Sequence, residues 1–102
     1  MKIAIAADTA DIDSAVSSHG ARAGFYFIFD GSGNLDEILE NPLASIGHGA
    51  GSRVADLLAD KGVNTVIAGD FGPRFESGLA EHGITTKRND GTISRVLREF
   101  IE

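Results

Sequence analysis

The stretch Gly24-Phe-Tyr-Phe-Ile-Phe-Asp30, followed by Gly31-Ser-Gly-Asn34 and Leu35-Asp-Glu-Ile-Leu-Glu40, decides the fold. Its first part is rich in aromatic, β-prone residues, which predicts a strand. The glycine-containing segment predicts a turn, and the third part predicts a returning strand at the sheet edge because it carries several acids. The stretch therefore predicts an antiparallel hairpin.

A further strand precedes the hairpin and a helix follows it. Residues 2–7 form a short apolar run, which predicts a buried first strand, whereas residues 9–22 lack sustained periodicity and are expected to form a loop. After the hairpin the period changes. Val54, Leu57 and Leu58 mark one face of a helix over residues 50–61.

The rest of the chain alternates between strands and helices. Residues 63–68 predict a strand, residues 73–83 a helix that starts at a proline, and residues 84–87 a fifth strand. The clearest helical pattern comes last, behind a possible cap at Thr92, and its apolar positions are Ile93, Val96, Leu97 and Phe100. The order βββαβαβα predicts an α/β fold with a mixed sheet and helices on its faces.

Length and composition limit the class of protein. With 102 residues, the chain is expected to form a single domain over residues 1–102. The net charge of −6 argues against nucleic-acid binding, which normally needs a basic surface. The apolar run at the N-terminus is too short for a signal peptide or a membrane span, so we expect a cytoplasmic protein without a membrane partner. Because the sequence has no cysteine, a bound metal must use histidine, carboxylate, backbone or its own inorganic sulfide as ligands.

Two glycine loops form the candidate binding site. Gly47-His-Gly-Ala-Gly51 opens the first predicted helix, and Gly69-Asp-Phe-Gly-Pro73 opens the second. A helix N-terminus presents unpaired N–H groups and a partial positive charge, and glycine lets an anion approach the backbone closely. If both loops lie at the same end of the sheet, they flank one crevice. We therefore predict an anion site whose glycines are Gly49, Gly51, Gly69 and Gly72. The alternative is that these glycines only form tight turns.

Histidine and arginine side chains are candidates for the same site. His48 lies between two glycines, and His19 lies in another loop of small residues shortly before the aromatic strand. Imidazole can donate, accept or ligate a metal, so both are candidate metal ligands, with a solvated side chain as the alternative for His48. Arg22 supplies a fixed positive charge near His19. His82, beside Gly83, is expected to cap a helix or to complement its dipole.

Two carboxylates offer a competing site. Asp8 ends the first predicted strand and Asp70 follows the fourth, so both are candidates to hold Mg²⁺ for phosphoryl transfer. Such sites usually contain three or four acids, and Asp8 and Asp70 can equally accept N–H bonds within their turns. No P-loop, HExxH or GxSxG motif is present.

Several short segments follow one another in a fixed order. They are Met1-Lys-Ile-Ala-Ile-Ala6, Val16-Ser-Ser-His19 with Arg22, Glu40-Asn-Pro42, His48-Gly-Ala-Gly51, Leu57-Leu58, Lys61-Gly-Val63, Val66-Ile-Ala-Gly69 and Gly72-Pro73. With these segments in this order, the chain resembles the NifX/NifB C-terminal family, the dinitrogenase iron–molybdenum cofactor biosynthesis domains, over almost its whole length. One difference is that Gly20-Ala21 follows His19, where the family commonly has a bulky aromatic residue and then glycine.

The resemblance implies a fold similar to ribonuclease H, with a mixed five-stranded sheet and flanking helices. It also implies a small binding protein rather than an enzyme, a carrier or scaffold for an anionic metal–sulfur cluster of the iron–sulfur, iron–molybdenum or molybdenum-containing kind. The implied partners are this cluster and the proteins that donate and accept it. Two other functions stay open, a divalent-metal phosphohydrolase that uses Asp8 and Asp70, and a regulatory or interaction module with a vestigial pocket.

Overall fold

The computed structural model of the protein describes residues 1–101, and within them the elements follow the predicted order βββαβαβα. The strands are β1 (Lys2–Ala7), β2 (Phe25–Asp30), β3 (Leu35–Glu40), β4 (Thr65–Ala68) and β5 (Thr85–Arg88). The helices are α1 (Ala50–Asp60), α2 (Pro73–Glu81) and α3 (Ile93–Ile101). The predicted α/β class is confirmed.

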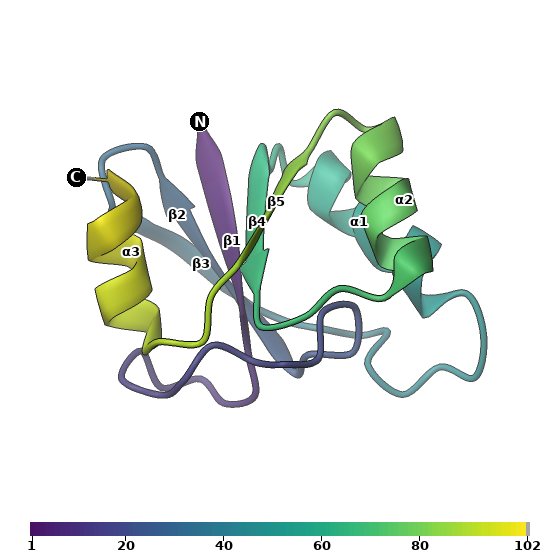
Figure 1. The fold of residues 1–102 in the computed structure, drawn as a ribbon, viewed down its shortest axis with the longest axis horizontal. Helices are drawn as coiled ribbons and strands as arrows, with labels where there is room; N and C mark the ends of the chain where they lie inside the picture. Colours follow the sequence, from purple (N-terminus) through teal and green to yellow (C-terminus); the bar gives the residue numbers. More distant parts are fainter. Residues whose placement is uncertain (102) are drawn as a thin grey trace.

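The strands form one mixed sheet in the order β3-β2-β1-β4-β5. β2 and β3 form the predicted antiparallel hairpin, and β3 lies at the sheet edge as expected. β1 pairs antiparallel with β2, whereas β4 is parallel to β1 and β5 is parallel to β4. In Figure 1, α1 and α2 lie on one side of the sheet and α3 lies on the other. Because β1, β4 and β5 run in the same direction, the loops that follow them gather at one end of the sheet, at the bottom of Figure 1.

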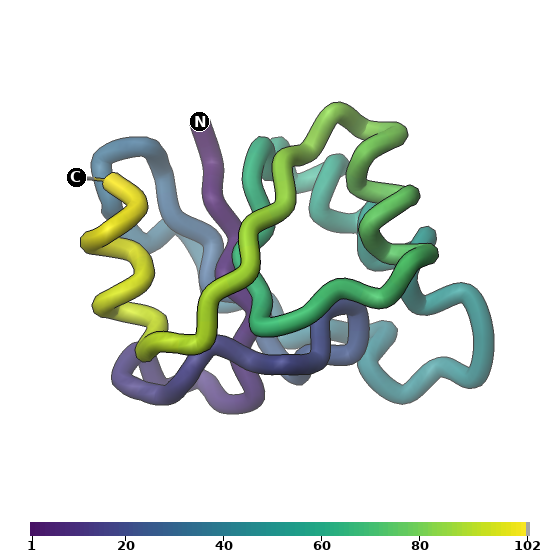
Figure 2. Tube along the Cα trace, viewed as in Figure 1, coloured from purple at the N-terminus to yellow at the C-terminus, as the bar shows by residue number. Residues whose placement is uncertain are grey.

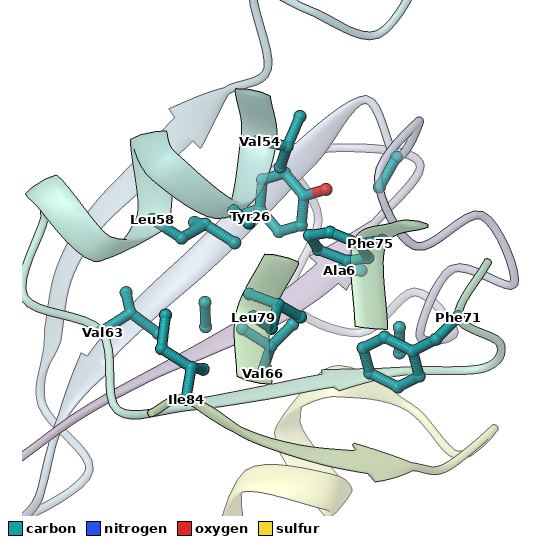
Figure 3. Close-up of a cluster of buried hydrophobic side chains, with 14 of the residues drawn as sticks. Ala6, Tyr26, Val54, Leu58, Val63, Val66, Phe71, Phe75, Leu79 and Ile84 are labelled. Carbon is teal, nitrogen blue, oxygen red and sulfur yellow. The ribbon is translucent and has the colours of Figure 1, made fainter. Parts of the chain in front are cut away.

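The alternation of side chains along the strands produces a hydrophobic cluster on each face of the sheet. Ala4 and Ala6 of β1 belong to the cluster beneath α1 and α2, while Ile3 and Ile5 belong to the cluster beneath α3. Figure 3 shows the first cluster, in which the buried ring of Tyr26 lies among side chains of both helices. The sheet is therefore buried on both faces in its centre.

Both α1 and α2 end at a glycine in the left-handed region, Gly62 with φ 80° and Gly83 with φ 71°. The N–H of the residue that follows each glycine then donates to a carbonyl of the preceding helix. Val63 donates to the carbonyl of Leu58 at 3.1 Å, and Ile84 does the equivalent in α2. Since these two N–H groups are used at the helix ends, β4 and β5 begin slightly later than the sequence predicts.

The last helix, α3, begins behind the predicted cap. The Thr92 hydroxyl oxygen accepts the N–H of Arg95 at 3.3 Å. The helix buries Ile93, Val96 and Leu97 against the second cluster, so the predicted apolar pattern is confirmed. None of the helices in residues 1–101 has both the length and the apolar character that crossing a membrane requires.

Candidate functional site

A cavity of about 510 Å³ lies at the end of the sheet where the parallel strands terminate. Three segments that are distant in the sequence line it, namely residues 18–22 after β1, residues 47–51 at the start of α1, and residues between 70 and 75 at the start of α2. In Figure 2 these segments gather at the lower right of the molecule. The volume lies within the range of roughly 300–1,000 Å³ that is usual for small-ligand sites. The two glycine loops thus flank one crevice.

Most of the residues predicted to bind a ligand line this cavity. They are His19, Arg22, His48, Gly49, Gly51 and Gly72. Gly69 does not. Its N–H donates to the carbonyl of Ser17 at 2.7 Å, and an added Cβ there would lie 3.0 Å from the Cα of Ser18. Gly69 therefore permits the loop after β1 to pass close to the end of β4, and its position does not match the predicted ligand contact.

The cavity has a positive balance of side-chain charge, although the chain as a whole carries −6. Arg22 and Arg74 line it, and among the described residues Asp70 is the one carboxylate in the lining. Arg74 is not among the predicted site residues. Its position directly after Pro73, in the first turn of α2, was the available signal. Two fixed cations and two imidazoles therefore face a space that contains one acid.

Both helices present an uncapped N-terminus to the cavity. The N-cap residues are Gly49 for α1 and Gly72 for α2, and neither offers a side-chain cap within the described part of the chain. The N–H of Arg53 bonds back to Gly49 at 3.1 Å, and the N–H of Glu76 bonds back to Gly72 at 3.0 Å. The N–H groups of the preceding helical residues have no partner in the helix ladder and are available to a ligand or to water.

The two helix N-termini lie close together because α1 has a glycine where they meet. A Cβ added to Gly51 would lie 2.7 Å from the backbone nitrogen of Phe75 and 3.0 Å from the carbonyl carbon of Arg74. Only a residue without a side chain permits this approach. Gly51 thus lets the N-termini of both helices line one cavity.

Arg22 has a structural partner as well as a place in the lining. Its Nη1 donates to the carbonyl of Ile46 at 2.7 Å and to that of Ala44 at 3.3 Å. These carbonyls belong to the loop that leads to His48. Arg22 therefore joins two walls of the cavity, in addition to contributing positive charge.

The loop that carries His19 is fixed from the protein interior. The hydroxyl of Tyr26 donates to the carbonyl of Gly20, and burial raises the pKa of this phenol, so it stays protonated at neutral pH. The buried Asn41 side chain donates to the carbonyls of Ala21 and Ala23, each at 2.9 Å. This wall is consequently positioned by buried hydrogen bonds rather than by surface contacts.

His19 and His48 are both exposed and both line the cavity, whereas His82 does not. His82 occupies the C-cap position of α2, in line with its predicted place at a helix end. Its Nε2 lies 2.7 Å from a carboxylate oxygen of Asp56 on α1. His82 is thus a helix-to-helix contact, and it offers a control for the two cavity histidines.

The competing carboxylate site is not assembled. Asp8 and Asp70 do follow neighbouring parallel strands, but Asp8 accepts the Ser17 hydroxyl at 2.7 Å and Asp70 lies 3.6 Å from the guanidinium of Arg88. Residues 1–101 contain no group of three or more His, Cys, Asp or Glu side chains that could hold a metal ion.

Comparison with known proteins identifies the family of the chain. The family model described as dinitrogenase iron-molybdenum cofactor matches residues 1–102. An uncharacterised protein of Methanocaldococcus jannaschii is 32% identical over 106 residues, covering 100% of this chain and 86% of that protein. The apo form of the orange protein from Desulfovibrio gigas has a TM-score of 0.89 at 26% identity, covering 98% of this chain and 86% of its own.

A second solved structure comes from Thermotoga, for a protein with a provisional NifB assignment. It has a TM-score of 0.82 at 34% identity and covers 97% of this chain and 85% of its own. The fold predicted from the resemblance is thus shared with solved structures along nearly the whole chain. The chain belongs to the dinitrogenase iron-molybdenum cofactor family.

Proposed function

We propose that the protein binds an anionic metal–sulfur cluster in this cavity and carries it without chemical conversion. The observation that carries the proposal is the positively balanced lining at two uncapped helix N-termini, within a protein of net charge −6. The family description, which names an iron-molybdenum cofactor, supports the class of ligand.

The donor set fits such a cargo. The sequence contains no cysteine, so the protein cannot supply thiolate ligands, and the cluster must bring its own sulfide. Backbone N–H groups and guanidinium groups donate hydrogen bonds to anions, and the neutral imidazoles of His19 and His48 are able to ligate an exposed metal of the cluster. These are the groups that line the cavity. Proteins that donate and accept the cluster complete this role.

The open space at two glycines also supports the proposal. A Cβ added to Gly47 or Gly72 would meet no protein atom within 4 Å, although both residues line the cavity. Gly72 is also the N-cap of α2 and has φ −69°, which any residue adopts. A larger side chain at position 72 therefore fits the fold but occupies space beside the helix N-terminus.

Anaerobic reconstitution with ferrous iron, molybdate and sulfide tests the proposal. After gel filtration, metal and sulfide analysis and the visible absorption spectrum are expected to show a cluster that co-elutes with the protein. Gly72→Val and Arg74→Gln are expected to lower its occupancy. Arg98→Gln removes the same charge from α3, on the opposite side of the sheet, and is expected to leave occupancy unchanged. Absence of co-eluting metal, or equal occupancy in all of these proteins, would reject a cluster site in this cavity.

A further inference from the structure

Arg88, at the end of β5, does not line the cavity but contacts the loop that does. Its Nε lies 3.6 Å from a carboxylate oxygen of Asp70, and its Nη2 lies 3.6 Å from a carboxylate oxygen of Glu76. Its guanidinium carbon lies 5.7 Å from the centre of the Phe71 ring. The Arg88 guanidinium thus faces two carboxylates, one before α2 and one in its first turn, and lies over the ring of Phe71.

The position of this guanidinium is set by well-packed elements. Arg88 pairs with Ala68 in the parallel β4–β5 ladder, and the N–H of Asn89 donates to the Ala68 carbonyl at 3.1 Å. Phe71 is buried and stacks on the ring of Phe75, with ring centroids 5.7 Å apart. Figure 3 labels both residues within the first hydrophobic cluster. The sheet ladder therefore holds the backbone of Arg88, and the ring beneath its side chain belongs to the hydrophobic core.

Asp70 is the partner that matters for the cavity, because it is the one carboxylate that the described residues place in the lining. An uncompensated carboxylate there repels an anionic ligand, and the repulsion grows with the charge of the ligand. We propose that Arg88 sets the charge selectivity of the cavity by neutralising Asp70, so that a dianion binds better than a monoanion of the same shape. This inference rests on the proposed function. Arg88 acts as a positioning residue, since it is not expected to touch the ligand.

The expected effect follows from the form of Coulomb's law. Interaction energy is proportional to ligand charge, so a loss factor for a monoanion is squared for a dianion of the same size. The Arg88 and Asp70 side chains are 58% and 71% exposed, so water and salt weaken the effect. We expect removal of the Arg88 charge to weaken monoanion binding about twofold and dianion binding about fourfold.

Tetrathiorhenate and tetrathiomolybdate are matched probes, because both are tetrahedral anions with four terminal sulfides and they carry charges of −1 and −2. Their dissociation constants are measured by equilibrium dialysis at low salt with the unchanged chain, Arg88→Gln, Asp70→Asn and the double variant. Circular dichroism and unfolding curves verify that each variant folds. Arg98→Gln on α3 is the control for a change in net charge alone.

The inference requires a specific pattern. The preference for the dianion is the dissociation constant of the monoanion divided by that of the dianion. Arg88→Gln lowers this ratio and Asp70→Asn raises it. The double variant returns the ratio to within about twofold of its value in the unchanged chain. Equal loss of both anions in Arg88→Gln, without recovery in the double variant, would show that Arg88 only stabilises the loop. Binding of neither anion by the unchanged chain would reject the inference, whereas the reconstitution experiment tests the proposed function separately.

Discussion

Replacing Gly51 by alanine tests whether the close approach of α1 and α2 builds the cavity. The added Cβ would lie 2.7 Å from the Phe75 nitrogen and 3.0 Å from the Arg74 carbonyl carbon, both of them backbone atoms. Backbone atoms in the first turn of a helix cannot rotate away as the end of a side chain can. The two helices must therefore separate, or one of them must tilt.

Two opposing terms determine the size of the effect. Alanine stabilises a helix interior by about 1 kcal/mol relative to glycine. Overpacking costs about 1–3 kcal/mol, and a contact with backbone atoms belongs to the upper part of this range. We therefore expect a net loss of about 1–2 kcal/mol in the free energy of unfolding, or a drop of about 5–10 °C in the unfolding midpoint for a chain of this size.

Thermal and urea unfolding, followed by circular dichroism, measure this loss. Gly47→Ala is the matched control, because a Cβ at Gly47 meets no atom within 4 Å. It is expected to leave the midpoint within experimental error. Since Gly51→Ala also displaces the helix N-termini, it should weaken anion binding together with stability. A Gly51→Ala protein that is as stable as the original chain would refute the packing argument.

Three further predictions concern single side chains. His48→Ala should lower cluster affinity roughly ten- to a hundredfold without moving the unfolding midpoint. In the same dialysis assay His82→Ala should leave the affinity unchanged. If His48→Ala binds as tightly as the original chain, His48 does not belong to the site. Tyr26→Phe leaves the Gly20 carbonyl without its donor and should lower the free energy of unfolding in urea by about 1 kcal/mol. An unchanged free energy of unfolding would show that the Tyr26–Gly20 hydrogen bond does not stabilise the protein. Hydrogen bonds from the backbone and side chain of Asn34 hold the pKa of Asp30 below its usual value, so its contribution to stability is present at neutral pH and is lost as pH falls through that lowered pKa. Asp30→Asn should reduce this acid-dependent loss in urea midpoints, and an unchanged pH profile would contradict it.

Features with local signals were predictable from the sequence. The hairpin follows from an aromatic run, a turn and an acidic run within residues 24–40, and the helix ends follow from Gly62 and Gly83. Thr92 likewise bonds within one helical turn. In each of these cases the residues that determine the conformation lie close together in the sequence, so the pattern itself contains the information.

The site was predictable only in part, because its geometry depends on contacts between distant segments. Arg74 has no motif of its own and gains a place in the lining from the crossing of α1 and α2. Gly69 looks like a ligand contact in the sequence, but it packs against Ser18, 51 positions earlier in the chain. Arg22 was expected to supply a charge, and its bonds to the carbonyls of Ala44 and Ile46 were not foreseen. Apart from the place of Arg74 directly after Pro73, none of these contacts leaves a local trace in the sequence.

Five glycines in or beside the cavity fall into two physical groups. At Gly20, Gly51 and Gly69 an added Cβ would lie within 3.0 Å of an atom of another segment, so these residues let the walls come together. At Gly47 and Gly72 an added Cβ meets nothing within 4 Å, so these residues leave the space open. Close walls place two helix N-termini beside one space, and the open positions give a ligand access to them.

The acidic surface and the cationic cavity together define what can bind. A net charge of −6 repels extended polyanions, because they must lie along a surface much larger than the cavity. A compact anion would avoid most of this repulsion in the proposed site, a space of about 510 Å³ lined by arginines, imidazoles and helix N-termini. Affinity for such an anion should therefore depend on the few charges in and beside the lining. Exchange of Asp60 on α1 for asparagine, which changes the net charge outside the cavity, should alter tetrathiomolybdate binding less than Asp70→Asn. Equal effects of the two substitutions in dialysis at the same ionic strength would show that net charge, and not the cavity, governs anion binding.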